Sequence, residues 1–122
     1  MLKALSVMAL ISSLASVALA QELNGHPPQD QEIHRLFYHG WMQPDSPWVS
    51  CCSEADCAPA EERFQDGHWI ARKVNSGEDW VVIPEAKIET KRDNPDGRPH
   101  LCTTRAMAGW SIVLCFIHGT GT

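Results

Sequence analysis

Beyond its first twenty residues, the 122-residue sequence has no second long apolar run, no block of lysine and arginine, no Cys-x-x-Cys pair and no internal repeat. Without another apolar run, no transmembrane helix is predicted. Without a basic block, nucleic acid and anionic lipid are not expected as main partners. Without a Cys-x-x-Cys pair, a disulfide oxidoreductase is disfavoured. No motif is specific enough to assign a reaction, so the sequence predicts no catalytic residue and no cofactor.

The first twenty residues predict a cleavable signal peptide. Lys3 gives the start a positive charge, residues 4–20 are apolar apart from serines, and the run ends in Ala18-Leu19-Ala20. A charge, an apolar stretch and an Ala-x-Ala end are the three parts of a secretory signal. The alternative, a membrane anchor, needs about 20 strongly apolar residues, and this run is rich in alanine and serine. We therefore expect cleavage after Ala20 and a soluble protein that is periplasmic or secreted.

The remainder of the chain has the length of one small domain. Residues 21–28 are polar and contain two prolines and a glycine, which is typical of a flexible leader. Residues 29–122 are expected to form a single disulfide-stabilised domain. Loss of Lys3 with the signal peptide changes the formal net charge from -5 to -6. A chain of this size buries only about 60 to 70 per cent of its unfolded surface, so covalent bridges matter for its stability.

All five cysteines lie in the exported part, where thiols become oxidised. Two bridges and one leftover thiol are expected, but five choices of the odd cysteine and three pairings of the others leave fifteen connectivities open. At least one bridge is predicted to tie the loop around the first three cysteines to the C-terminal strands. The odd thiol leaves a disulfide-linked dimer possible. The disulfide candidates are Cys51, Cys52, Cys57, Cys102 and Cys115.

The pattern of apolar residues predicts one helix followed by short strands. Apolar residues recur at helical spacing within 29–42, and residues 43–59, with three prolines, predict an irregular loop. After residue 59 the pattern alternates, with Asp66-Gly67 and Ser76-Gly77 as turn signals. This favours a mainly β fold, a small SH3-like barrel or curled antiparallel sheet with one N-terminal amphipathic helix; a pair of packed sheets is the alternative. The predicted strands are 62–65, 68–74, 80–84, 98–103 and 111–118, with a single helical turn at 84–88.

Several segments together resemble a known group. They are HRLFYHGWMQP, SCCSEADC, GHWIARKVNSGEDWVVIP, PDGRPHLC and LCFI. Their order resembles an uncharacterised family of small exported Gram-negative bacterial proteins that share a Cys-Cys-x4-Cys cluster, a Trp-rich hairpin, and late Gly-Arg-x-His-x-Cys and Cys-Phe motifs. The resemblance covers residues 34–117 and implies that His100 and the five cysteines belong to one shared local structure. It implies no activity.

Thiolate and imidazole groups raise the possibility of a metal site. Cys51, Cys57, His100 and Cys102 could supply a tetrahedral set for zinc or a soft site for copper, although their spacing is not that of a zinc finger and disulfide formation competes. A second group, His34, His39 and Met42 with His26, has the ligand types of exported copper proteins. His34 and His39 are five residues apart and would lie on different faces of a helix.

Five tryptophans are many for so small a core. Large aromatic side chains fill thin cores well, which is the structural interpretation. The functional interpretation is that some stay exposed and stack on a glycan or a partner protein. Three lie near glycine or proline in expected loops or at the ends of elements, which makes them the candidates for a ligand surface: Trp41, Trp48 and Trp110.

These patterns favour an exported non-enzymatic domain that binds a protein or glycan of the cell envelope. The alternative hypothesis is a periplasmic protein that binds zinc or copper through cysteine, histidine and methionine. The two differ in their response to chelator, because a domain held by thiolate–metal bonds loses stability there and a disulfide-bonded domain does not. An enzyme is the third possibility.

Overall fold

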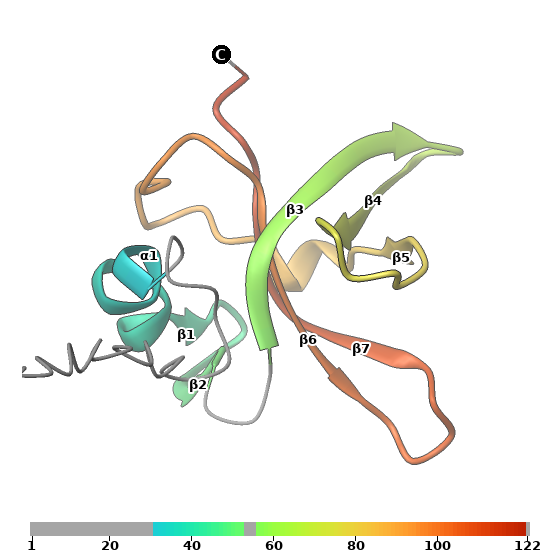
Figure 1. Ribbon diagram of the computed structural model, residues 1–122, viewed down its shortest axis with the longest axis horizontal. Helices are drawn as coiled ribbons and strands as arrows, with labels where there is room; N and C mark the ends of the chain where they lie inside the picture. Colours follow the sequence, from blue (N-terminus) through green and yellow to red (C-terminus); the bar gives the residue numbers. More distant parts are fainter. Residues whose placement is uncertain (1–30, 53–55, 122) are drawn as a thin grey trace, which may run out of the picture.

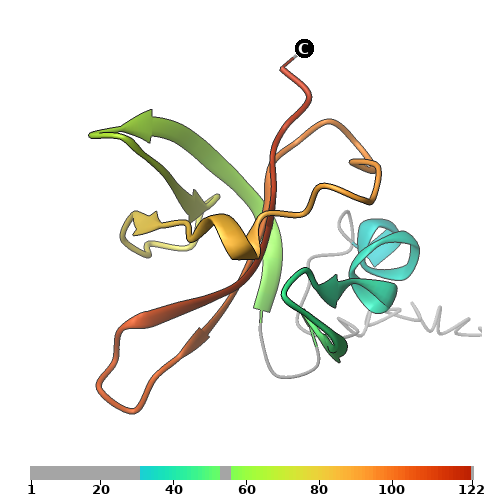
Figure 2. The same cartoon turned by 180° about the vertical axis from the view of Figure 1, so that it is seen from behind.

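The computed structural model describes residues 31–52 and 56–121 of the chain, so the predicted signal peptide and leader lie outside the described residues. It confirms a mainly β fold, a curled half-barrel sheet with one short α-helix. Five antiparallel strands follow the order β5-β4-β3-β6-β7, and β1 and β2 form a separate two-stranded sheet. In Figures 1 and 2, α1, β1 and β2 lie on one side of the long strand β3, and β4 and β5 lie on the other.

The N-terminal helix is shorter than the predicted 29–42. The α-helix α1 (Gln31–Leu36) gives way to a 3₁₀ turn, η3 (Tyr38–Gly40). Trp41 N–H donates to the Tyr38 carbonyl at 3.2 Å, an i to i−3 bond typical of a tighter helix. The tighter turn allows Phe37, Tyr38 and Trp41 all to be buried.

Within the predicted irregular loop 43–59, residues 43–52 and 56–59 form more regular structure than their prolines indicated. The hairpin of β1 (Met42–Gln43) and β2 (Ser46–Ser50) lies there, and so does the first part of β3 (Asp56–Gln65). Pro59 is compatible with β3 because the strand changes partners at that point. Residues 56–59 pair with β6 (His100–Arg105), and residues 60–65 pair with β4 (His68–Lys73). The strand curls at this change of partner, and Pro59 has no N–H to leave unpaired.

The predicted strands and turns after residue 60 are present in the structure. Asp66 and Gly67 connect β3 to β4, with φ angles of 52° and 79°, as a two-residue hairpin turn requires. The short edge strand β5 (Val81–Val82) is followed by the 3₁₀ turn η4 (Glu85–Lys87), where one helical turn was predicted. The last strand, β7 (Ser111–Ile117), pairs with β6.

The core has two parts, one on each face of the sheet. The concave interior of the half-barrel holds Ala60, Ala71, Ile83, Leu101, Val113 and Phe116. On the other face, the rings of Phe37, Tyr38 and Trp41 pack with the four bridged cysteines. The helix and the disulfides therefore cover one face, and the concave face is filled by side chains of the sheet itself.

Candidate functional site

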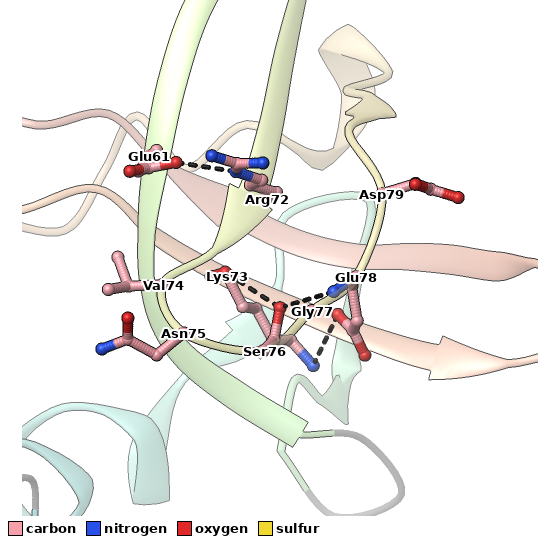
Figure 3. Close-up of a pocket in the computed structure, with 9 residues that line it drawn as sticks. All are labelled: Glu61, Arg72, Lys73, Val74, Asn75, Ser76, Gly77, Glu78 and Asp79. Carbon is pink, nitrogen blue, oxygen red and sulfur yellow. Dashed lines mark hydrogen bonds and ion pairs between the residues drawn. The ribbon is translucent and has the colours of Figure 1, made fainter.

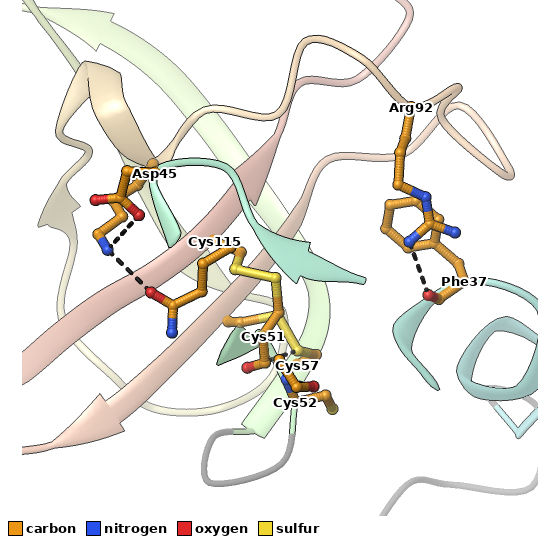
Figure 4. The surroundings of a disulfide bond; sticks show 11 residues. Phe37, Asp45, Cys51, Cys52, Cys57, Arg92 and Cys115 are labelled. Carbon is orange, nitrogen blue, oxygen red and sulfur yellow. Dashed lines mark hydrogen bonds and ion pairs between the residues drawn. A yellow bond between two sulfur atoms is a disulfide. The ribbon is translucent and has the colours of Figure 1, made fainter. Parts of the chain in front are cut away.

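Two disulfides connect the end of β2 and the start of β3 to the C-terminal hairpin. Cys57 lies directly opposite Cys102, and Cys102 lies directly opposite Cys115, across β3, β6 and β7. The bridges are Cys51–Cys115, shown in Figure 4, and Cys57–Cys102, with sequence separations of 64 and 45. Two bridges with one leftover thiol are thereby confirmed, and both bridges make the predicted tie to the C-terminal strands.

This pairing corrects the first predicted metal set. Cys51, Cys57 and Cys102 are bridged and are not available as thiolates. His100 uses Nδ1 and Nε2 in hydrogen bonds. In the second set, the rings of His34 and His39 are 6.4 Å apart between centroids, and His26 lies outside the described residues. In residues 31–52 and 56–121 no three histidine, cysteine or acidic side chains are grouped to hold a metal ion.

The leftover thiol is Cys52, which is half-buried against the disulfide cluster. Burial raises the pKa of its thiol, and the charge of Asp56 raises it further. A hydrogen bond with the backbone of Cys57 and the charge of Lys73 act in the opposite direction and are outweighed. A raised pKa lowers the thiolate fraction at neutral pH, and the thiolate is the reactive form.

Cys52 is therefore expected to react slowly with iodoacetamide. Without reductant, the folded protein should take up one alkyl group, and more slowly than the same protein in denaturant. Intact mass against time measures both the number of groups and the rate. Uptake of two or more groups without reductant, or equal rates in the folded and denatured states, would contradict this account of Cys52.

A chain of hydrogen bonds, buried at Tyr38 and His100, joins the N-terminal turn to the loop before β6. The Tyr38 hydroxyl and His100 Nδ1 are 2.7 Å apart, and His100 Nε2 and the Asp96 carboxylate are 2.8 Å apart. Arg98 forms an ion pair with the other Asp96 oxygen at 2.6 Å. This arrangement has the hydrogen bonding of a catalytic triad, but Tyr38 and His100 are fully buried, so it serves to fasten the helix side of the core to the sheet.

Asp96 makes the stability of this network dependent on pH. Burial by itself raises the pKa of Asp96, but the hydrogen bonds from His100 and Arg98 outweigh it, and the pKa is lowered. A carboxyl group whose pKa is lowered by folding stabilises the fold above its unfolded pKa. That stabilisation is lost as pH falls through the folded value.

The difference in unfolding free energy between wild type and Asp96→Asn is therefore expected to be largest near neutral pH. It should shrink in the acid range below the ordinary aspartate pKa of about 3.9. Urea unfolding of both proteins at neutral and acid pH measures this difference. A difference that grew as pH fell would show that the sign of the linkage is wrong.

The structure separates the three candidate tryptophans. Trp41 is fully buried, so it does not belong to a ligand surface; the 3₁₀ turn directs it into the core despite its place near glycine and proline. Trp48, on β2, is 80% exposed, and Trp110, in the β6–β7 hairpin, is 61% exposed. They lie on different hairpins.

Trp110 borders a cavity of about 350 Å³ between the β6–β7 hairpin and the chain entering β5. We call this cavity the open-edge groove. Besides Trp110, the side chains that line it include Arg105 and Ser111 from the hairpin. On the β5 side they include Glu78, Asp79 and Trp80. The groove thus combines two indole rings with carboxylate, guanidinium and hydroxyl groups.

Trp80 was not among the three tryptophans that the sequence singled out. It is half-buried, and the Arg63 guanidinium carbon lies 3.8 Å from its ring centroid, with that of Arg72 at 4.8 Å. Arg72 also pairs with Glu61 at 2.7 Å. These contacts hold the ring at the rim of the groove by cation–π attraction.

The loop from Val74 to Asp79 positions Trp80 and separates the groove from a neighbouring cavity of about 380 Å³, shown in Figure 3. The Ser76 hydroxyl donates to the Lys73 carbonyl at 2.9 Å and accepts from Glu78 N–H at 3.1 Å. Beneath the loop, the Lys73 ammonium lies 3.9 Å from the Glu78 carboxylate. The loop is therefore anchored at both its start and its end.

Comparisons with family models, curated protein sequences and solved structures gave no match. The resemblance to exported Gram-negative proteins therefore stays a prediction. Among the helices of the described part of the chain, none is long and apolar enough to span a membrane.

Proposed function

We propose that this protein is an exported, non-enzymatic domain that binds a polypeptide of the cell envelope at the open-edge groove. The observation that carries the proposal is the position of the groove. It lies beside the two edge strands of the sheet, β5 and β7, which are not hydrogen-bonded to each other. Trp80 and Trp110 flank it. An exposed tryptophan next to unpaired strand edges, here Trp110, is a feature of protein-binding surfaces.

A polypeptide suits this site better than a glycan. A glycan can stack on Trp110 and can bond to Asp79 and Arg105, but it makes no use of backbone N–H and C=O groups arranged as a strand edge. A polypeptide can use the rings and the edges together. The two disulfides support the exported location, because such bridges persist in oxidising compartments.

Site-specific photo-crosslinking in a Gram-negative periplasm tests the proposal. A photoreactive phenylalanine analogue replaces Trp110, and in a matched control it replaces Trp48, which is more exposed but lies on β2. We expect a protein adduct from position 110 and little or none from position 48. No protein adduct at 110, or a glycan adduct in its place, would refute the proposal.

A further inference from the structure

The two free edges of the sheet run in the same direction. Each neighbouring pair in the order β5-β4-β3-β6-β7 is antiparallel, so the direction alternates and β5 and β7 are parallel to each other. They cannot pair as antiparallel neighbours, and a closed barrel of antiparallel strands needs an even number of strands. β5 and β7 are not paired with each other in the sheet, and only an isolated parallel bridge, Ile88 with Phe116, joins the segment after β5 to β7.

The edge of β5 presents backbone groups to this opening. Ile83 N–H donates to the Trp69 carbonyl at 2.8 Å, so residue 83 faces β4. Backbone groups alternate in direction along an antiparallel strand. The N–H and C=O groups of Val82, and the C=O group of Trp80 just before the strand, therefore point away from β4, toward the opening.

The edge of β7 presents backbone groups in the same way over part of its length. Ala106 N–H donates to the Trp110 carbonyl at 2.9 Å, so the alternation directs the backbone groups of Ser111 and Val113 away from β6. Farther along, Phe116 is covered, because its carbonyl accepts from Glu89 N–H at 2.7 Å. The open part of this edge is thus the part that borders the groove.

These four residues form no backbone hydrogen bond outside the strand ladders within the described part of the chain. We infer that the open-edge groove accepts one extended segment of the partner protein, which runs antiparallel to both β5 and β7 and closes the half-barrel as a sixth strand. This inference rests on the proposed function and specifies how the polypeptide binds.

The surroundings of the opening define the side chains of such a segment. Val81, Ile83 and Val113 belong to or pack against the concave core, so inward-facing residues of the segment meet aliphatic groups. Outward-facing residues lie between the rings of Trp80 and Trp110. The segment therefore alternates aliphatic and polar residues, the pattern of a strand with one buried face.

The probe is a peptide of about seven residues with capped termini, in which valine and threonine alternate. Two further peptides carry N-methyl groups on the odd or on the even residues. In a strand paired on both sides, odd and even N–H groups bond to opposite neighbours. Each methylated peptide should therefore bind about tenfold more weakly or worse, because each loses the hydrogen bonds to one edge. Amide NMR shifts at Val82 and Val113 measure the titration.

A variant of the protein gives a second readout. Proline is tolerated on an edge strand where the lost N–H faces outward, so Val82→Pro should keep the fold and weaken peptide binding, with Val82→Thr as the control. Thermal unfolding verifies the fold of both variants.

The outcomes separate this inference from the proposed function. If only one of the two methylated peptides lost binding, the segment would pair with a single edge strand, and the inference that it closes the half-barrel would be overturned. Equal binding of all three peptides, or no shift at millimolar peptide, would overturn strand pairing. A protein adduct at position 110 would still support the proposed function in these cases. Loss of that adduct refutes both.

Discussion

Reduction of the two disulfides is expected to unfold the domain. Cys51–Cys115 and Cys57–Cys102 close chain segments with sequence separations of 64 and 45. In the chain-entropy model each closure stabilises the fold by about 4 kcal/mol, and the whole net stability of a small domain is about 5–15 kcal/mol. Far-ultraviolet circular dichroism with and without reductant should show loss of the β signal and a large fall in Tm.

Two controls accompany this experiment. Cys52→Ser removes the one unbridged cysteine among the described residues and should leave Tm nearly unchanged in the absence of reductant. Chelator should also leave Tm unchanged, whereas a domain held by metal would lose stability. A protein that kept its Tm in reductant and lost it in chelator would contradict the disulfide account and favour the metal-binding hypothesis.

His100→Phe is expected to destabilise the domain by about 3 kcal/mol. The substitution nearly keeps the ring size but removes both nitrogens, which leaves the fully buried Tyr38 hydroxyl without this partner, whereas water can reach the Asp96 carboxylate. A buried polar group that loses its partner costs about 1–3 kcal/mol. Urea unfolding measures the change in free energy.

His118→Phe is the matched control. His118 Nδ1 lies 2.7 Å from Glu62, a comparable hydrogen bond, but the side chain is one-third exposed. Water can solvate Glu62 after the substitution, so the expected loss is about 1 kcal/mol or less. Equal losses for the two variants would show that burial of the His100 network adds nothing to its stabilising effect.

The sequence predicted the later strands because their pattern is local. Alternation and the Asp66-Gly67 turn depend on neighbouring residues only, so β4 and its hairpin were predicted correctly. The first part of β3 was missed because Pro59 indicates a loop. Only the change of partner from β6 to β4 makes proline acceptable there, and that change depends on the whole sheet.

The disulfide pairing and the groove depend on contacts between distant residues. Cys102 lies opposite both Cys57 and Cys115, so register alone leaves two partners for it, and the sequence left fifteen connectivities open. Trp80 and Trp110 line the same cavity because the sheet curls, and no local sequence pattern predicts that curl. Trp110 was nevertheless singled out correctly as an exposed residue, from its glycine neighbour and expected hairpin position.

The most direct test of the central claim compares Trp110→Ala with Trp48→Ala in binding to the polypeptide captured from position 110. Both side chains are exposed, so neither substitution should change Tm much. A tryptophan at the centre of an interface contributes about 2 kcal/mol or more, or about thirtyfold in Kd. The account predicts such a loss for Trp110→Ala and an unchanged Kd for Trp48→Ala. A loss with Trp48→Ala and none with Trp110→Ala would place binding on the β1–β2 hairpin and contradict it.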